Sequence, residues 1–381
     1  MQTLGVGIIG YGFMGKVHSY DYRSLPIYYE PLPVRTKLVG VADAVPERAR
    51  MAVEQAGFEF GTSDWRELVA RDDIHIIDIC SPNSFHADQL LAAMTAGKHI
   101  YCDKPLVAGE EAMGRVEVPL RSYGGVGQMA LQYRFYPATL RAKQLIDEGF
   151  VGKVVSFRGA YLHSGSLDPM KPMGWKQVKS EAGGVVYDMA PHIVDMLDYL
   201  VGPLASVYTQ THILYPQRPN ARGEMVAVEA EDLMVMLAKL SSGTIGVIET
   251  SKIATGAEDE LRFEIHGDRG ALRFNSMDPN YLDAYDLLDA ETPLGGQRGW
   301  RRIACIQRYD KPAGFPGPKF SIGWIRAHLH SLYNFLDAIA TGKPPKPSLL
   351  DGLNLQYVLA AAEKSARTQI WQSLPSPTAH T

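Results

Sequence analysis

Cysteine is scarce in this 381-residue chain, which contains only Cys80, Cys102 and Cys305. Three scattered cysteines are too few for a disulfide framework or a cysteine-based metal cluster, and they favour a reducing compartment. We therefore expect a cytoplasmic protein with no metal site. The chain also lacks a basic apolar leader and any run of about 20 apolar residues, so we expect neither a secretory signal nor a membrane span.

Positive charge is not in excess either. The formal net charge is −4 and no stretch is dense in Lys or Arg, which argues against nucleic acid or a membrane as a partner. The hydrophobic fraction of 46% and the charged fraction of 21% are typical of a globular protein. A chain of this length is longer than a single hydrophobic core usually supports, so we expect two domains. Small molecules are the expected ligands.

The first third of the chain alternates short apolar runs with helical patterns. This alternation predicts an α/β domain with a doubly wound parallel sheet. The expected strands are 6–9, 38–42, 74–80, 99–102 and 126–131, and the expected helices are 46–56, 65–70 and 86–96. We place this domain at residues 1–126.

Beyond residue 150 the expected strands follow one another directly, which predicts an α+β domain with a large, mainly antiparallel sheet, placed at residues 127–381. Helices at 182–200 and 326–340 are expected to cover one face. The other face would be free to meet a second subunit. The expected strands are 153–163, 205–214, 233–240, 244–250, 261–266 and 271–274, and the expected loops are 165–173, 217–223 and 290–317.

The stretch VGIIGYGFMGKVH at 6–18 contains a glycine motif that is typical of dinucleotide binding. Gly10, Gly12 and Gly15 form GxGxxG directly after an apolar strand and before a helical pattern. Their roles would be a tight turn, close approach to a pyrophosphate, and close packing of helix on strand. A glycine-rich turn in another kind of α/β protein is the alternative.

Asp43 ends the next expected strand, LVGVAD, where a carboxylate can accept hydrogen bonds from an adenosine ribose. No arginine follows it directly, which favours NAD over NADP, although Arg48 keeps NADP open. Asp43 lies farther from Gly15 than the usual spacing, and we interpret 25–37, with three prolines, as a lengthened loop. The alternative role for Asp43 is a helix cap.

Two later segments carry residues suited to chemistry. Lys104 follows an expected strand and precedes Pro105, at the sheet edge where such folds bind ligands, although it could be a solvated surface charge. Asp188, His192 and Asp195 are spaced i, i+4 and i+7, which would place them on one face of a helix. A base beside an orienting carboxylate suits proton transfer. The alternatives are that Asp188 caps the helix, that His192 is a core histidine and that Asp195 is a solvated carboxylate.

Several longer motifs resemble the glucose-fructose oxidoreductase, inositol dehydrogenase and MocA (Gfo/Idh/MocA) family across nearly the whole chain. They are GYGFMG, CSPNSFH (80–86), AGKHIYCDKPL (96–106), YRFYP (133–137), DMAPHIVDML (188–197) and FEIHGDRGALRF (263–274). The resemblance implies an N-terminal Rossmann domain, a C-terminal open-faced sheet, and homodimers or homotetramers. Stretches such as TSDW and FRGAYL are most similar to the family's sugar dehydrogenases and their inositol-oxidising relatives.

The resemblance also implies roles for residues. Lys104 would contact the substrate hydroxyl and the nicotinamide, and Asp188 and His192 would be the paired catalytic positions, with His192 as general base. Asp103 stands where glutamate is usual. The implied cofactor-binding residues are Gly10, Gly12, Phe13, Met14, Gly15, Asp43, Ser81, Pro82, Asn83, His86, Asp103 and Lys104. The expected substrate-binding residues are Lys104, Arg134, His163, Trp175, Lys176, Asp188 and His192.

Together these residues suit the NAD-dependent oxidation of a ring hydroxyl on a monosaccharide, anhydrosugar or cyclitol. A base must take the hydroxyl proton while the carbon gives a hydride to C4 of the nicotinamide, and no metal is needed. The alternatives are a glycosidase of the same family that oxidises its substrate transiently, and a nicotinamide-binding sensor without turnover. Arg134 could instead form a structural ion pair, and His86 could be exposed.

Overall fold

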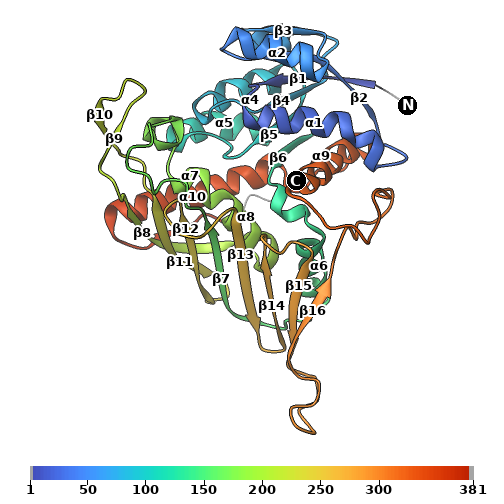
Figure 1. Ribbon diagram of the computed structural model, residues 1–381, viewed down its shortest axis with the longest axis vertical. Helices are drawn as coiled ribbons and strands as arrows, with labels where there is room; N and C mark the ends of the chain where they lie inside the picture. Colours follow the sequence, from blue (N-terminus) through green and yellow to red (C-terminus); the bar gives the residue numbers. More distant parts are fainter. Residues whose placement is uncertain (1–2, 377–381) are drawn as a thin grey trace.

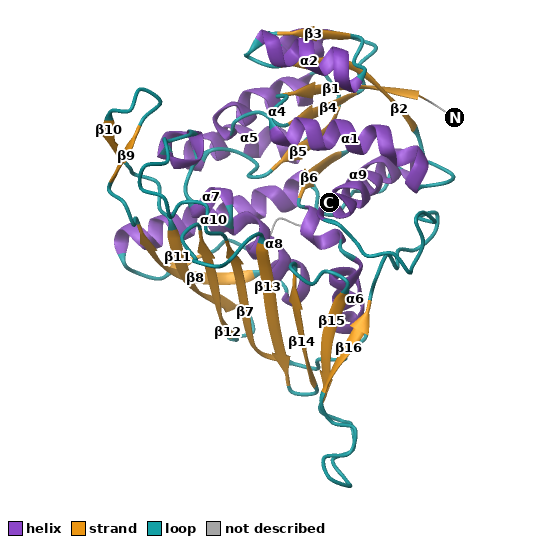
Figure 2. Ribbon diagram, in the orientation of Figure 1, coloured by secondary structure: helices purple, strands orange, loops and turns teal. Residues whose placement is uncertain are grey.

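The computed structural model describes residues 3–376, which form two domains stacked end to end (Figure 1). The N-terminal domain is an α/β unit, and a broad sheet lies beneath it with helices between the two (Figure 2). No helix in the described part of the chain is long and apolar enough to cross a membrane.

The N-terminal sheet is entirely parallel and has the strand order β3-β2-β1-β4-β5-β6. The order reverses between β1 and β4, and ligands of such sheets bind at the carboxyl ends of the strands beside that point. The predicted Rossmann sheet is therefore confirmed. Its strands are β1 (Thr3–Ile9), β2 (Arg35–Ala42), β3 (Phe60–Thr62), β4 (Ile76–Ile79), β5 (His99–Asp103) and β6 (Gly127–Ala130).

Two helical segments of this domain were not predicted as helices from the sequence. The expected loop at 25–37 is helical at its start, because α1 continues through Pro26 to Tyr28, where it packs against helix α9 (Trp324–Thr341) and Leu25 is buried. Helix α5 was not predicted. The helices are α1 (Phe13–Tyr28), α2 (Pro46–Ala56), α3 (Trp65–Ala70), α4 (His86–Thr95) and α5 (Gly109–Arg121).

The second sheet has the order β16-β15-β14-β13-β7-β12-β11-β8-β17, and all its neighbours are antiparallel except β7 and β12. The mainly antiparallel sheet is thus confirmed. Its strands are β7 (Val154–Leu162), β8 (Leu204–His212), β11 (Leu233–Leu240), β12 (Ile245–Ser251), β13 (Glu260–Gly267), β14 (Gly270–Asn275), β15 (Tyr281–Asp286), β16 (Trp300–Ala304) and β17 (Gln372–Ser373).

Two of the expected loops contain strands. β16 lies within 290–317, and β9 (Gln217–Pro219) begins 217–223 and pairs with β10 (Met225–Ala227). β16 is an edge strand whose side chains are mostly exposed, so its sequence has no apolar alternation to identify it.

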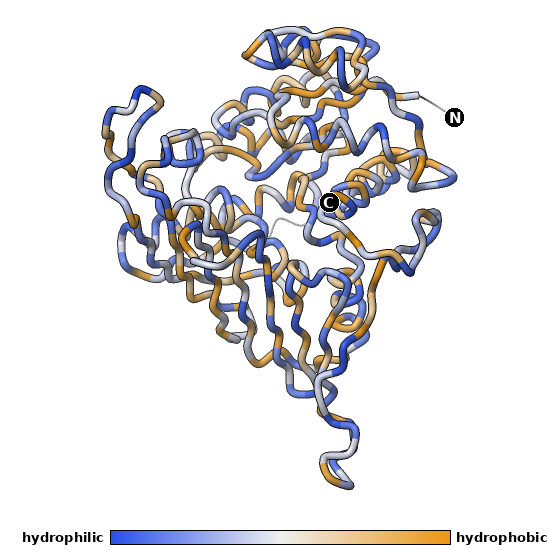
Figure 3. Tube along the Cα trace, viewed as in Figure 1, coloured by the Kyte–Doolittle hydropathy of each residue, from blue (hydrophilic) through white to orange (hydrophobic). Residues whose placement is uncertain are grey.

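One face of the second sheet is covered by α6 (Pro137–Asp147), α8 (Ala190–Val201) and α10 (Leu349–Thr368). Along β11 the residues alternate, with Met234 and Met236 buried and Val235 and Leu237 partly exposed on the open face. In Figure 3, hydrophobic and hydrophilic residues both occur along the strands of this sheet. The open-faced sheet is thus confirmed.

The C-terminal part of the chain returns to the N-terminal domain. Helix α9 (Trp324–Thr341) was expected on the second sheet, but it packs on α1 and β6. Its apolar stripe, with Leu332 and Phe335, joins the core beneath β1. β6 also lies beyond the predicted boundary at residue 126, yet it completes the first sheet. The placement of α9 could not be predicted, because a hydrophobic stripe does not indicate which sheet a helix will cover.

The expected helix at 182–200 is two helices. α7 (Val185–Asp188) ends before Met189, and α8 starts at Ala190 with Pro191 in its first turn. Proline has no N–H and suits the start of a helix better than its interior. Asp188 and His192 therefore do not share one helix, and the single face predicted for Asp188, His192 and Asp195 is wrong.

Candidate active site

The glycine turn between β1 and α1 has the shape that a dinucleotide needs. Gly10 has φ +95°, and a Cβ there would lie 2.6 Å from the carbonyl oxygen of Cys80. A Cβ on Gly15 would lie 2.0 Å from the Gly10 oxygen, so helix and strand touch at this point. At Gly12 a Cβ would meet nothing within 4 Å, which leaves the backbone open to a pyrophosphate. The residues present therefore fit NAD.

Asp43 lies directly beyond β2, beside this turn. Its carboxylate accepts hydrogen bonds from the backbone N–H groups of Tyr11 (2.8 Å) and Val45 (2.9 Å). Val45, and not Asp43, is the N-cap residue of α2, so the helix-cap alternative does not hold. The nearest guanidinium nitrogen of Arg48 is 3.9 Å from Oδ1. The glycine turn and the carboxylate are thus held together as one unit.

The segment after β4 approaches the second domain. Asn83 is buried, and its side chain donates to the carbonyl oxygen of Ala182 (3.3 Å). His86 is fully buried, with its ring nitrogens 3.0 Å from the Ser81 oxygen and 2.9 Å from the Pro105 oxygen. His86 is therefore not exposed, and it joins the segment after β4 to the segment after β5.

The remaining residues expected to bind cofactor lie at the edges of this region. Phe13 is largely exposed and its ring lies 5.8 Å from that of Trp324, while Met14 is half-buried. Asp103 accepts a hydrogen bond from the backbone N–H of Lys104 (2.8 Å). The shorter side chain at position 103 thus bonds to the next residue and fixes the start of the Lys104 backbone.

Lys104 and Asp188 meet between the two domains. The Lys104 ammonium donates to Oδ1 (3.0 Å) and to the main-chain oxygen (2.5 Å) of Asp188. Both side chains are largely buried. Lys104 follows β5 of the first sheet and Asp188 ends α7 of the second domain. The structure therefore brings together two of the three residues expected to be catalytic.

Two further lysines contact the same carboxylate. Lys176 lies 3.3 Å from Oδ1 and Lys252 lies 3.1 Å from Oδ2 of Asp188. Burial by itself would raise the pKa of Asp188, but the three ammonium groups hold that pKa well below its ordinary value. Asp188 is therefore an anion across the neutral range, and it cannot serve as the proton acceptor there.

His192 is the neutral partner in this group of residues. It is buried in the second turn of α8, and Tyr133 and Tyr161 lie edge-on to its ring at 5.1 and 5.5 Å. Burial, and then the charge of Lys104, lower the pKa of His192 well below its ordinary value. Its Nδ1 has no hydrogen-bond partner among the described residues. A neutral imidazole can accept a proton on its unprotonated ring nitrogen.

A carboxylate that the sequence did not indicate is bound by the two tyrosines that lie against His192. Asp259 accepts hydrogen bonds from the hydroxyls of Tyr161 (2.6 Å) and Tyr133 (2.9 Å), and His163 Nε2 is 3.1 Å from it. Partial burial would raise the pKa of this carboxyl, but these neighbours lower it to about 2. His163 thus reaches the site through Asp259. The only signals of this cluster in the sequence were the motifs that contain its donors, YRFYP with Tyr133 and FRGAYLH with Tyr161 and His163.

Trp175 and Lys176 enter the site from a loop. Trp175 is partly exposed, and the Lys176 ammonium lies 5.6 Å from its ring centre. Burial lowers the pKa of Lys176, although Asp188 opposes this shift. The loop thus brings an aromatic surface and a cation to the edge of the site.

Arg134 and Asp195 form the structural ion pair that the sequence left open. Nε and Nη2 of Arg134 donate to the two carboxylate oxygens of Asp195 at 2.6 and 2.5 Å, and both residues are buried. Burial outweighs the guanidinium charge and raises the pKa of Asp195. Neither residue is part of the group around Asp188, so the expected substrate role of Arg134 is not supported.

This pair predicts a large stability effect. Asp195→Asn is expected to lower the free energy of unfolding by about 3 kcal/mol, because it leaves a buried guanidinium without its counter-charge. Asp147→Asn is the control, since Asp147 makes only an exposed pair with Lys143 on α6. Urea unfolding measures both variants. Equal losses for the two variants would contradict this assignment.

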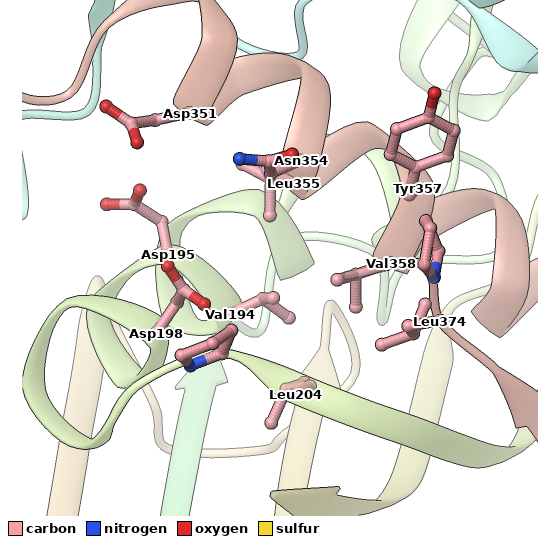
Figure 4. A pocket seen from close by; sticks show the side chains of 12 residues that line it. Val194, Asp195, Asp198, Leu204, Asp351, Asn354, Leu355, Tyr357, Val358 and Leu374 are labelled. Carbon is pink, nitrogen blue, oxygen red and sulfur yellow. The ribbon is translucent and has the colours of Figure 1, made fainter. Parts of the chain in front are cut away.

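A small cavity lies beside this ion pair (Figure 4). Its volume is about 40 Å³, which suits a few water molecules and not a sugar. It is therefore not the substrate site. Its lining residues are Val194, Asp195, Asp198, Pro203, Leu204, Asp351, Asn354, Leu355, Tyr357, Val358, Leu374 and Pro375.

A second buried polar cluster lies beneath the glycine turn. His18 Nδ1 is 2.9 Å from Asp78 Oδ1, and the Cys80 thiol donates to Asp78 (3.2 Å). Burial lowers the pKa of His18, but Asp78 outweighs burial and raises it to about 9. The resulting ion pair ties α1 to β4.

Domain comparisons agree with this architecture. The family described as "Oxidoreductase family, NAD-binding Rossmann fold" matches residues 4–122, and the "GFO/IDH/MocA C-terminal domain" matches residues 139–273. The chain belongs to the Gfo/Idh/MocA family. The resemblance seen in its motifs is thereby confirmed.

Among characterised Gfo/Idh/MocA proteins, levoglucosan dehydrogenase of Pseudarthrobacter phenanthrenivorans is 35% identical over 98% of this chain and 99% of that protein. Myo-inositol 2-dehydrogenase of Thermotoga maritima is 24% identical, over 94% of this chain and 95% of that protein. The solved complex of a levoglucosan dehydrogenase with NADH and levoglucosan is 35% identical, with a TM-score of 0.93 over 98% of this chain and 100% of that one. The solved structure of an oxidoreductase domain protein from Kribbella flavida is 34% identical, with a TM-score of 0.93 over 99% of this chain and 100% of that one. This chain is an NAD-binding Gfo/Idh/MocA oxidoreductase of the sugar and inositol dehydrogenase type.

Proposed function

We propose that this enzyme oxidises a secondary ring hydroxyl of a monosaccharide, anhydrosugar or cyclitol with NAD. The observation that carries the proposal is the contact of Lys104 with Asp188 between the domains, beside a neutral His192. The levoglucosan and inositol dehydrogenases among the relatives act on substrates of this class, as their names state.

His192 acts as the general base. Its pKa is low enough for the imidazole to be neutral at working pH, so one of its ring nitrogens carries no proton and can accept one. Protonated His192 is stabilised by the carboxylates of Asp188 and Asp259, both of which raise its pKa. The histidine can therefore take the hydroxyl proton and then release it.

Lys104 holds the oxygen that loses this proton. Two of its three N–H groups donate to Asp188, so one is left for the substrate. A charge-assisted hydrogen bond stabilises a developing alkoxide more strongly than it stabilises the neutral hydroxyl. Lys104 thus favours the transition state of the reaction.

NAD would be held by the turn at Gly10, Gly12 and Gly15, with Asp43 beside the adenosine ribose. When bound, it supplies the hydride acceptor. The anionic Asp43 disfavours a 2′-phosphate, so NAD is preferred to NADP.

The test is an absorbance assay for reduced nicotinamide with purified protein and a panel of monosaccharides, anhydrosugars, glycosides and inositols. We expect NADH to form with one group of ring polyols, and NADP to be a poorer acceptor. Glycoside cleavage without net reduction would overturn the proposal in favour of a glycosidase. Cofactor binding without turnover of any compound would indicate a sensor.

We further propose that the open face of the second sheet pairs two copies of the chain. Val235, Leu237, Ile245 and Val247 are apolar and between about 38% and 53% exposed there, and such a patch marks an interface. Light scattering is expected to give a dimer or tetramer. Val235→Glu with Val247→Glu should shift the mass to the monomer, whereas a monomeric wild type would contradict the proposal.

A further inference from the structure

Lys252 is a buried cation at the active site that no sequence motif indicated. It follows β12 directly, and its backbone N–H donates to the Asp232 oxygen (2.8 Å) while its own oxygen accepts from Ser166 N–H (2.9 Å). The chain is thus anchored on both sides of this residue. The residue is only 8% exposed, although lysine is rarely buried without a partner.

The Lys252 ammonium makes an ion pair without a directed hydrogen bond. It lies 3.1 Å from Asp188 Oδ2, yet no acceptor among the described residues receives one of its N–H groups in hydrogen-bonding geometry. Glu231 is the other acidic group whose titration it affects. The contact is therefore electrostatic, and its strength comes from burial, where opposite charges are weakly screened.

The three lysines contact the Asp188 carboxylate at its two oxygens. The contacts of Lys104 and Lys176 are to Oδ1, at 3.0 and 3.3 Å, and that of Lys252 is to Oδ2, at 3.1 Å. The Lys176 side chain is about half exposed, whereas that of Lys252 is about one-tenth exposed. Lys252 is therefore the residue that holds Oδ2 of Asp188.

We propose that Lys252 is a positioning residue for the reaction, because it holds Asp188 Oδ2 and so keeps Oδ1 directed at Lys104. This inference rests on the proposed function, in which the remaining N–H of Lys104 binds the substrate oxygen. Without Lys252, Oδ2 is free to accept a hydrogen bond from Lys104 or from a substrate hydroxyl. Either change moves the Lys104 ammonium relative to the reacting oxygen.

The experiment compares Lys252→Met, Lys252→Arg and the control Lys364→Met, whose lysine is exposed on α10. We expect Lys252→Met to lower kcat about 10- to 100-fold, as a misplacement of about 1 Å does. The dissociation constant for NADH and the midpoint of unfolding should match those of the control. Lys252→Arg should recover most of kcat.

Three outcomes would overturn the inference. They are an unchanged kcat in Lys252→Met, a raised KM for the sugar with kcat retained, which would show direct substrate binding, and failure of arginine to restore kcat.

If wild-type protein turns over no compound, the proposed function fails, but Lys252 can still be tested. Difference infrared spectra against Asp188→Asn follow the protonation of Asp188. That transition should lie at higher pH in Lys252→Met, and an unmoved transition would overturn the inference whatever the activity.

Discussion

His192→Asn is expected to lower kcat for sugar oxidation by about 10²- to 10⁴-fold, the range that positioned acid-base groups contribute. Asparagine is similar in size but cannot accept a proton near neutral pH. Binding of NADH, followed by fluorescence, should be unchanged, because His192 lies in α8 of the second domain and not at the glycine turn. His212→Asn is the control, since His212 is exposed at the end of β8.

The same assignment predicts the pH dependence of the wild-type enzyme. Burial and the Lys104 charge lower the pKa of His192, so the free enzyme should keep its base neutral below the ordinary histidine value of about 6.5. The acid limb of kcat/KM should therefore lie below that value and vanish in His192→Asn. An acid limb that remains in the variant at an unchanged pH would assign the base to another group.

Lys104→Met is expected to lower kcat/KM by about 10²- to 10³-fold, as the loss of one donor to a developing oxyanion does in other enzymes. Methionine keeps much of the volume, and Asp188 keeps two cations, Lys176 and Lys252, so folding should be preserved. Steady-state kinetics with the identified sugar measures the effect. Lys343→Met, at an exposed position after α9, is the control.

The double variant of Lys104 and His192 provides a further check. Two groups that act on the same oxygen give losses that are not additive, so the double variant should be little slower than the worse single variant. Full additivity would indicate that the two residues act independently. Substantial activity in the double variant would overturn the proposed mechanism.

Local features of the chain could be predicted from its sequence. Gly10, Gly12 and Gly15 were recognisable because a positive φ and close backbone approach are requirements of single positions. The alternation of strands and helices in the first domain was equally plain, since most residues of its buried parallel strands are apolar. The edge strand β16 was not, because its exposed side chains carry no such pattern.

The candidate site was predicted in its residues but not in its arrangement. Lys104, Asp188 and His192 were named, yet Asp188 and His192 lie on separate helices and not on one face of a single helix. Asp195, chosen by the same spacing, pairs with Arg134 instead. A helical spacing cannot reveal that a helix ends between two of its members.

The sequence by itself determined the two kinds of sheet, the glycine turn and the family, because each depends on residues close together in the chain. Only the tertiary structure decided that α9 returns to the first domain and that Lys252 and Asp259 join the site. Lys252 follows β12 and Asp259 precedes β13, far along the chain from Lys104. Ion pairs and hydrogen bonds between such distant residues depend on how the sheets and helices pack, and that packing is a property of the whole chain.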